Sequence, residues 1–313
     1  MTINVGLIGY GYWGKNILRN LKNFTNINNI YCLDHLNYKN SKKIFFYKNE
    51  KLFFKTPIDV FIVATPTRTH LRFLKKCLKL NKHVCVTKPV FKNLKQLYSI
   101  DKKFYNLDKI FADHTYIYHP SIIFIKNLIK NNVLVKIIYF DSERISFGKF
   151  YEDNDVIDDL AIHDLYLLDY FFPNDKFTYS RKSVSKNFGN KIYFSNIALR
   201  SKKNLFVNIK VNWFSPFKSR RIIIAGEKKT VVFDDTLTDE KVKIYKKGIK
   251  MKNFKKQKTW EYRIGGMEVP YISPKESLNI MLQNFFKFSS GNKVPTNFNH
   301  IKRVFKLHAL VKK

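Results

Sequence analysis

The chain has 313 residues, 45% of them hydrophobic, which is enough for two packed domains. Its formal net charge is +34, but 48 of the 58 basic residues are lysines, and they are scattered through every segment rather than gathered in one helix or tail. Because arginine is the usual reader of bases and phosphates, this distribution argues against a specific nucleic-acid partner and favours a bias toward adenine- and thymine-rich codons as the source of the charge.

The sequence also argues against export and against a membrane span. The N-terminus enters an apolar strand almost at once, without the pattern of a signal peptide, and no apolar run approaches the roughly 20 residues that cross a bilayer. Cys32, Cys77 and Cys85 form no Cys-x-x-Cys pair and lie in apolar segments, which predicts reduced structural thiols with neither a disulfide nor a metal site. We therefore expect a soluble, cytoplasmic protein.

Short apolar runs alternate with helical patterns over the first 119 residues. Strands are expected over residues 4–8, 30–34, 59–64, 83–87 and 109–113, and helices over 13–22, 68–80 and 94–104. Such alternation is typical of a doubly wound parallel sheet with helices on both faces. We therefore predict an α/β chain that begins with a Rossmann domain over residues 1–119.

The pattern changes near residue 120. A helix is expected over 121–130, a strand over 133–141 and a short helix over 158–171, followed by alternating stretches over 191–200, 205–213, 221–225 and 230–233. These stretches predict a C-terminal α+β domain over residues 120–313 with a large, mainly antiparallel open sheet, whose solvated face is a natural place for subunits to meet. A hairpin or loop is expected over the basic stretch 247–258, and two helices, over 274–288 and 298–311, close the chain.

Three glycines, Gly9, Gly11 and Gly14, stand between the first strand and the first helix. In a dinucleotide-binding turn the first permits a tight turn, the second lets the backbone approach a pyrophosphate, and the third allows close packing of the helix. Three glycines in such a turn also suit packing alone. Asp34 closes the second apolar run, where a carboxylate accepts hydrogen bonds from the adenosine ribose, and no arginine follows it directly. The sequence therefore predicts NAD rather than NADP.

Two further places follow the ends of predicted parallel strands, where ligands bind in such sheets. Thr65, Pro66 and His70 follow the third strand, and they predict either cofactor contact or a simple capped helix start with Thr67 or Thr69 at the N-cap. Lys88 follows the fourth strand, and its ammonium group is a candidate hydrogen-bond donor or proton relay. A surface lysine is the alternative.

The expected short helix of the second domain carries Asp159 and His163, which are four residues apart and so share a face of an α-helix. An imidazole with an unperturbed pKa of about 6.5 beside a carboxylate is a candidate general base. The alternative is a helix start whose acids complement its dipole, with His163 merely interfacial.

Taken together, the glycine turn, the Thr65-Pro66 loop with His70, the Lys88-Pro89 pair and the Asp159-x-x-x-His163 helix resemble the Gfo/Idh/MocA family of oxidoreductases. The order and spacing match over nearly the whole chain. Within that family the resemblance is greatest to nucleotide-sugar 3-dehydrogenases that act on substrates such as UDP-N-acetyl-glucosaminuronate. The residues that carry it are 9–16, Glu143-Arg144 with Gly148, 159–164, and 213–221 leading to 233–235.

The resemblance implies that Lys88 holds the reacting hydroxyl between nicotinamide and sugar, and that His163 accepts the hydroxyl proton while Asp159 orients it. It further implies cofactor contacts from Tyr12 and Trp13, in addition to the residues above, and substrate contacts from Lys15, Asn16, Arg144 and Asp164. The expected partners are a nucleotide-sugar substrate, further copies of the chain in a homodimer or homotetramer, and a pathway aminotransferase that consumes a 3-keto product in amino-sugar or surface-polysaccharide synthesis.

Two positions depart from the family pattern. The family usually has glutamate before the lysine, where this chain has Thr87, and loss of that carboxylate favours the neutral lysine amine. The nucleotide-sugar subgroup tends to have an aromatic residue where this chain has Asp158. These departures leave open a catalytically silent NAD- or sugar-binding protein that regulates a pathway. A nucleic-acid-binding module is a more distant alternative.

Overall fold

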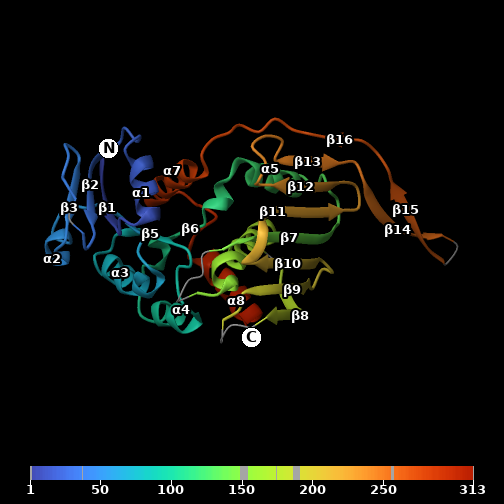
Figure 1. The fold of residues 1–313 in the computed structure, drawn as a ribbon, viewed down its shortest axis with the longest axis horizontal. Helices are drawn as coiled ribbons and strands as arrows, with labels where there is room; N and C mark the ends of the chain where they lie inside the picture. Colours follow the sequence, from blue (N-terminus) through green and yellow to red (C-terminus); the bar gives the residue numbers. More distant parts are fainter. Residues whose placement is uncertain are drawn as a thin grey trace. The chain divides into compact units, whose positions relative to one another are not determined.

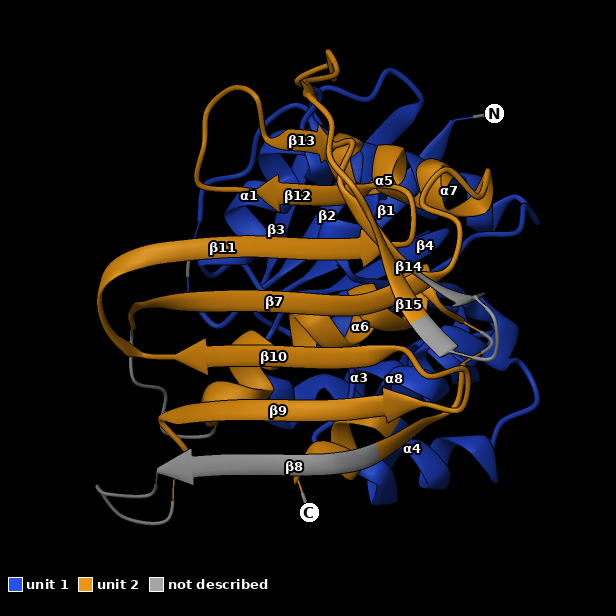
Figure 2. Cartoon of the chain, turned by 90° about the vertical axis from the view of Figure 1, so that its right-hand side faces the viewer, with its two compact units in different colours: residues 1–118, 275–306 blue, residues 119–274, 307–313 orange. Residues whose placement is uncertain are grey.

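The computed structural model describes residues 2–36, 38–148, 154–173, 175–185, 191–254 and 257–312. The chain divides into two compact units (Figure 2): unit 1 comprises residues 1–118 and 275–306, and unit 2 comprises residues 119–274 and 307–313. This differs from the expected continuous C-terminal domain over residues 120–313. Residues 275–306 belong to unit 1 because helix α7 (Ser277–Ser289) packs on helix α1 (Tyr12–Leu21), and because Ile301 and Phe305 join the hydrophobic core beneath the parallel sheet.

Unit 1 is built on a six-stranded parallel sheet in the order β3-β2-β1-β4-β5-β6 (Figure 1). The central strands are short apolar runs buried along their whole length, as a parallel sheet covered on both faces requires. The strands are β1 (Ile3–Ile8), β2 (Ile27–Leu33), β3 (Ile44–Tyr47), β4 (Val60–Val63), β5 (His83–Thr87) and β6 (Ile110–Asp113). The helices that follow α1 are α2 (Glu50–Phe53), α3 (Thr67–Lys79), α4 (Leu94–Asp101), η1 (Leu107–Lys109) and η2 (Thr115–Tyr118).

The strand order reverses between β1 and β4: the chain adds β2 and β3 on one side of β1, and then β4, β5 and β6 on its other side. In open α/β sheets this reversal is where ligands bind, beyond the carboxyl ends of the strands. The sequence did not predict β3 and α2, because a run of four residues, Ile-Phe-Phe-Tyr, has no periodicity that separates a strand from a loop. The predicted Rossmann architecture is otherwise confirmed.

Unit 2 contains an eight-stranded sheet in the order β16-β13-β12-β11-β7-β10-β9-β8. Figure 2 shows the part of this sheet from β13 to β9. Among the described residues its neighbouring strands pair antiparallel, except β7 with β10, so the predicted mainly antiparallel sheet is confirmed. The strands are β7 (Ile137–Phe147), β8 (Phe177–Ser185), β9 (Phe194–Ser201), β10 (Phe206–Asn212), β11 (Phe214–Gly226), β12 (Thr230–Asp234), β13 (Val242–Tyr245) and β16 (Met267–Glu268).

The predicted basic stretch forms a hairpin of β14 (Gly248–Phe254) and β15 (Gln257–Arg263), and residues 255–256 lie outside the described residues. The helices of unit 2 are α5 (Pro120–Lys130), the π-helical turn η3 (Ile157–Ala161), α6 (Ile162–Phe171) and the end of α8 (Phe298–Lys312). The η3 turn packs against β7 and β10, which places the predicted Asp159–His163 segment on one face of the sheet. Within the described part of the chain, no helix is long and apolar enough to cross a membrane.

Candidate functional site

The glycine turn of unit 1 uses its three glycines for three different reasons. Gly9 has a φ of +97°, and a methyl group there would lie 2.7 Å from the Ala64 carbonyl oxygen. A methyl group on Gly14 would lie 2.1 Å from the Gly9 carbonyl oxygen, so only glycine lets α1 approach β1 this closely. A methyl group on Gly11, in contrast, would meet nothing within 4 Å. The space above Gly11 therefore fits a ligand that contacts the backbone.

The start of α1 supports the same interpretation. Gly11 is its N-cap residue, no side chain caps it, and its first turn contains no acidic residue. The first amides of a helix have no partner within the helix and carry the positive end of its dipole. An uncapped helix start without acids fits a pyrophosphate.

Asp34 lies beside this turn, directly after β2. Its Oδ2 accepts a hydrogen bond from the Tyr10 amide at 2.7 Å, and its Oδ1 accepts one from the Leu36 amide at 3.1 Å. The carboxylate is thus fixed at the carboxyl end of β2, where a dinucleotide's ribose hydroxyls would find an acceptor. The donors of the turn and the carboxylate of Asp34 together fit NAD.

Two aromatic rings that the sequence did not indicate, those of Tyr38 and Phe46, pack against Tyr10 in this turn. The centroid of the Tyr10 ring lies 4.8 Å from that of Tyr38 and 5.0 Å from that of Phe46, and the Lys15 ammonium lies 5.7 Å from the Tyr10 centroid. Tyr10 occupies the variable position between the first two glycines, so its place in the motif was the available signal. Tyr38 and Phe46, which follow Asp34 in the chain, thus pack against the turn through the Tyr10 ring.

The remaining predicted residues of α1 differ in their surroundings. Tyr12 is 85% exposed, whereas Trp13 is half-buried and donates its indole N–H to Asp113 at 2.6 Å. Lys15 is exposed, and the Asn16 side chain donates to the Tyr12 carbonyl at 3.1 Å. Trp13 therefore attaches the glycine turn to the end of β6.

His70 joins the two loops that follow β4 and β5. Its Nε2 lies 2.7 Å from the Thr65 carbonyl oxygen and 3.3 Å from the Thr87 hydroxyl, and its Nδ1 lies 3.0 Å from the Pro89 carbonyl oxygen. The residue is 1% exposed, and this burial lowers the pKa of its imidazole, while the neighbouring carbonyls act in the opposite direction. His70 thus orders the two loops from within, and the expected direct cofactor contact does not fit its burial.

The start of α3 differs from the predicted cap. The helix begins at Thr67 with Pro66 as its N-cap residue, and no side chain caps it. Thr69 donates its hydroxyl hydrogen within this turn, with the Thr65 hydroxyl at 2.7 Å and the Pro66 carbonyl at 2.8 Å. Neither Thr67 nor Thr69 is the N-cap, because the fixed φ of proline already sets the chain for the helix.

Lys88 follows β5 directly and is half-buried, at the edge of the sheet where the glycine turn and Asp34 also lie. The Lys88–Pro89 peptide bond is cis. The position agrees with the expectation that the ammonium group stands at the carboxyl end of a buried parallel strand. Lys88 belongs to unit 1, and the predicted base His163 belongs to unit 2.

His163 lies at the second position of α6, just after the π-helical turn. Its Nδ1 lies 2.7 Å from the hydroxyl of Tyr166, which is fully buried, whereas His163 itself is half-buried. Asp159 and His163 were predicted to share one face of an α-helix, but η3 is wider than an α-helical turn and changes that alignment. Single π-helical turns are frequent at functional sites.

Asp159 accepts a hydrogen bond from the indole N–H of Trp213 at 3.3 Å. Trp213 is 1% exposed, and Gly148 packs so closely on its ring that a methyl group on Gly148 would lie 2.5 Å from Cδ1. The Gly148 amide also donates to the Trp213 carbonyl at 2.9 Å. Gly148 and Trp213, which both carry the family resemblance, therefore serve to position Asp159.

Arg144 and Asp164 require a correction, because the structure does not support their expected contact with substrate. Asp164 is 0% exposed and accepts two hydrogen bonds from the Arg144 guanidinium, both at 3.1 Å, and one from the Ser142 hydroxyl at 2.7 Å. Such a two-point pair is a strong charge-assisted interaction. Its place inside unit 2 ties β7 to α6, and so supports the helix that carries His163.

Asp158 is one of the two residues that depart from the family pattern, and it makes an ionic contact with the end of α8. Its carboxylate lies 2.8 Å from His308 Nε2 and 2.6 Å from Lys312 Nζ, and Asp155 also lies 3.1 Å from Lys312. Burial raises the pKa of Asp158, but His308 and Lys312 outweigh it and hold this pKa well below its usual value. The contact fixes the start of η3 to the C-terminal helix.

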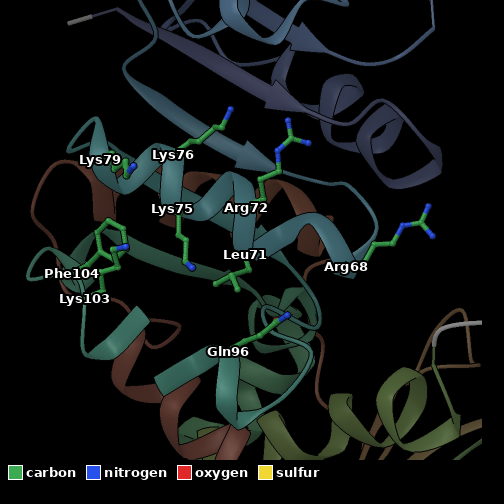
Figure 3. Close-up of a pocket in the computed structure, with 9 residues that line it drawn as sticks. All are labelled: Arg68, Leu71, Arg72, Lys75, Lys76, Lys79, Gln96, Lys103 and Phe104. Carbon is green, nitrogen blue, oxygen red and sulfur yellow. The ribbon is translucent and has the colours of Figure 1, made fainter. Parts of the chain in front are cut away.

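A separate hollow of about 450 Å³ lies beside α3 and the segment that follows α4 (Figure 3). Leu71 and Phe104 give it apolar walls, and its polar lining is mostly basic: Arg68, Arg72, Lys75, Lys76, Lys79, Gln96 and Lys103. Arg72 and Lys76 are both paired with Glu50. None of the predicted site residues lines this hollow, so it is separate from the glycine turn.

The three cysteines were expected to be structural thiols, because each lies in an apolar segment. All three cysteines are buried, and burial raises the pKa of each thiol, to about 12 for Cys32. A thiol with a raised pKa is a poor nucleophile at neutral pH. The three thiols are therefore poor candidates for a nucleophile.

Comparison with known proteins agrees with this geometry. Residues 3–112 match the model of an oxidoreductase family with an NAD-binding Rossmann fold, Gfo/Idh/MocA. An uncharacterized oxidoreductase of Escherichia coli (strain K12), YdgJ, is 29% identical over 147 residues, which are 45% of this chain and 42% of that protein. The match thus spans less than half the length of that relative.

Solved structures share the fold over nearly the whole chain. UDP-N-acetylglucosamine 3-dehydrogenase GnnA from Acidithiobacillus ferrooxidans has a TM-score of 0.78 at 16% identity and covers 99% of this chain and 97% of its own. A myo-inositol dehydrogenase from Corynebacterium glutamicum has a TM-score of 0.77 at 15% identity, with coverage of 99% and 95%. An oxidoreductase from Agrobacterium radiobacter, solved with NAD+, L-tartaric acid and magnesium, has a TM-score of 0.73 at 15% identity, with coverage of 100% and 95%. Residues 3–112 therefore match the NAD-binding Rossmann fold of the Gfo/Idh/MocA oxidoreductases, and the chain as a whole shares its fold with the solved structures named above.

Proposed function

We propose that the chain is an NAD-dependent oxidoreductase that oxidises a ring hydroxyl, at C3, of a nucleotide-linked sugar such as UDP-N-acetyl-glucosaminuronate. The observation that carries this proposal is the half-buried Lys88 at the carboxyl end of β5, in the same sheet edge as the uncapped glycine turn and Asp34. A cation at that edge is suited to hold a hydroxyl beside a bound dinucleotide.

NAD, when bound, supplies the acceptor for the hydride that leaves the sugar carbon. The proton of the same hydroxyl must go to a base, and oxidation then leaves a ketone on the sugar. In the proposed reaction Lys88 donates a hydrogen bond to the hydroxyl oxygen, and His163 accepts the hydroxyl proton. A positioned base of this kind contributes about 10²- to 10⁴-fold to the rate.

The contact between His163 and Tyr166 sets a condition on this role. A neutral imidazole carries one hydrogen, so His163 can accept a proton at Nε2 only when Nδ1 carries that hydrogen and donates it to the Tyr166 oxygen. Their separation of 2.7 Å suits this hydrogen bond. Tyr166 would thus select the tautomer of His163 that acts as a base.

The substrate class is supported by the activity of one solved protein of the same fold, a UDP-N-acetylglucosamine 3-dehydrogenase. Lys15 and Asn16, which lie on α1, are the residues of unit 1 that we propose to face the nucleotide sugar. A 3-keto product would suit an aminotransferase as the next enzyme. We also propose a homodimer or homotetramer that meets through the open face of the unit 2 sheet.

Thr87 favours a second candidate, a catalytically silent NAD- or sugar-binding regulator, because it replaces the family's usual glutamate with a hydroxyl that lies 3.3 Å from His70. Such a protein would bind both ligands and turn neither over.

The test uses the purified full chain with NAD and UDP-N-acetyl-glucosaminuronate, with formation of NADH as the readout. An aminotransferase or a keto-acid acceptor is included to draw the reaction forward. We expect NADH in the wild type, and a loss of turnover in Lys88→Met and His163→Asn with NAD binding retained. Lys92→Met, which removes an exposed lysine nearby, is the matched control. NAD and sugar binding without any NADH would instead support the silent regulator.

A further inference from the structure

Helix α3 has one buried apolar face and one exposed basic face. The buried face joins the hydrophobic core of unit 1, and the exposed face borders the hollow of about 450 Å³ (Figure 3). Four cations, Arg68, Arg72, Lys75 and Lys79, follow one another along α3 at intervals of three or four residues. Residues at this spacing are neighbours on the surface of an α-helix, so the four side chains form a row along it.

The cations of this hollow outnumber the acids beside it. Six of its nine described lining residues are lysine or arginine, and none is a carboxylate. A carboxylate from α2, Glu50, pairs with Arg72 and Lys76. Among the residues that the structure describes, Lys75 and Lys103 form no ion pair. Because like charges that lie together repel one another, an anion in the hollow would be stabilised.

The scatter of lysines over the whole chain does not explain this cluster. Helix α3 contains five cations and no acidic residue, and all five line the hollow. Arginine is rare in this chain, with 10 among 58 basic residues, yet Arg68 and Arg72 lie four residues apart on this helix. Arginine is the side chain best suited to bind phosphates or carboxylates, because its planar group donates two parallel hydrogen bonds.

Apolar side chains and one amide complete the wall of the hollow. Leu71 and Phe104 are half-buried and pack against the core of unit 1, which limits their freedom to move. Figure 3 shows Leu71 and Lys75 directed toward the side of α3 on which Gln96 lies. The Gln96 Oε1 accepts a hydrogen bond from the Lys92 amide at 2.9 Å, so its NH₂ group is left to donate elsewhere. The hollow thus joins cations to an apolar wall and a hydrogen-bond donor.

We propose that this hollow binds a nucleoside polyphosphate at a site separate from the NAD-binding turn. The lysines and arginines of α3 would hold the phosphates, while the base would lie against Phe104 and Leu71 and accept a hydrogen bond from Gln96. The volume falls within the range of small-molecule sites, roughly 300 to 1,000 Å³. The lining residues all belong to unit 1, and none lies in the glycine turn, so NAD and this ligand would bind together.

The first test is a calorimetric titration of the purified full chain with ATP, in the presence of saturating NAD so that the cofactor turn is occupied. We expect a single ATP to bind per chain. Inorganic tripolyphosphate lacks the base and adenosine lacks the phosphates, so each should bind at least about 10-fold more weakly than ATP. Failure of ATP to bind would overturn the proposal. Equal affinity for tripolyphosphate and ATP would also overturn it, because the cations alone would then account for binding.

Substitutions then locate the ligand on α3. Lys75→Gln combined with Lys79→Gln removes two cations of the row and should weaken ATP binding by about 10-fold or more. Lys42→Gln combined with Lys43→Gln removes the same charge from an exposed turn of unit 1, and should leave the affinity unchanged. Equal effects of the two pairs would refute the proposal, because net charge rather than the hollow would then determine binding.

The apolar wall has a test of its own. Phe104→Leu keeps an apolar side chain but removes the aromatic ring, so it should weaken the binding of ATP and leave that of tripolyphosphate unchanged. An unchanged ATP affinity in this variant would refute the position proposed for the base. These titrations do not use dehydrogenase turnover, so a chain without oxidoreductase activity would give the same results, and failure of the proposed function is distinguishable from failure of this site.

Discussion

Removal of one partner of the buried Arg144–Asp164 pair should destabilise unit 2 strongly. Arg144→Met would leave the Asp164 carboxylate, which is 0% exposed, with one hydrogen bond from Ser142 where it now accepts three. Loss of one partner of a buried ion pair costs about 3 to 5 kcal/mol. For a unit of this size that corresponds to a decrease in Tm of roughly 6 to 20 °C.

The assay is thermal unfolding followed by circular dichroism, together with KM for the sugar. Glu143→Gln is the matched control, because Glu143 lies on the same strand and its 3.0 Å pair with Lys210 is partly exposed, the lysine side chain by 42%. That pair should contribute at most about 1 kcal/mol. The double variant Arg144→Met with Asp164→Leu should regain much of the lost stability, because no unpaired charge remains. A single Arg144→Met variant with wild-type Tm and a raised KM would refute this reasoning and restore the substrate role expected from the sequence.

Three further outcomes follow from the site. Gly11→Ala should change the free energy of unfolding by no more than about 1 kcal/mol. It should lower the NAD affinity measured by calorimetry, because its methyl group enters the open space beside the turn. Gly14→Ala should lower both the stability and the NAD affinity, because its methyl group would lie 2.1 Å from the Gly9 carbonyl oxygen. Tyr166→Phe should lower kcat by about 10-fold with little change in KM, because the selected tautomer of the base is lost, and an unchanged kcat would exclude this role. The pKa of Asp158 is lowered in the folded chain, so its contact stabilises the protein above the unfolded value of about 4 and is lost as the pH falls below it; Asp158→Asn should therefore lower Tm at neutral pH, and the two Tm curves should converge in acid.

Local pattern was sufficient where a single segment carries its own signal. The first strand, the Gly9–Gly14 turn and the following helix were predicted because an apolar run, three glycines and a helical period adjoin one another in the chain. The strand before Lys88 was predicted over 83–87, as observed, because a buried parallel strand is a continuous apolar run.

The spacing of polar residues along the chain did not show which of them would meet in the folded protein. The resemblance implied substrate contacts for Arg144 and Asp164, whereas a buried side-chain pair between β7 and α6 brings the two together inside the unit. The π-helical turn at Ile157–Ala161 altered the alignment of Asp159 and His163, because an i, i+4 spacing defines one face only in an α-helix.

The sequence by itself determined that this chain has a parallel α/β sheet with an NAD-binding turn, because both follow from short segments whose apolar period and glycines act locally. Tertiary structure decided which polar groups meet. Asp113 reaches Trp13 across 100 residues, and residues 275–306 return to the first unit, because strand order and helix packing join segments that no local pattern links. The glycine turn was thus predictable from the sequence, whereas the Asp113 carboxylate that binds its Trp13 was not.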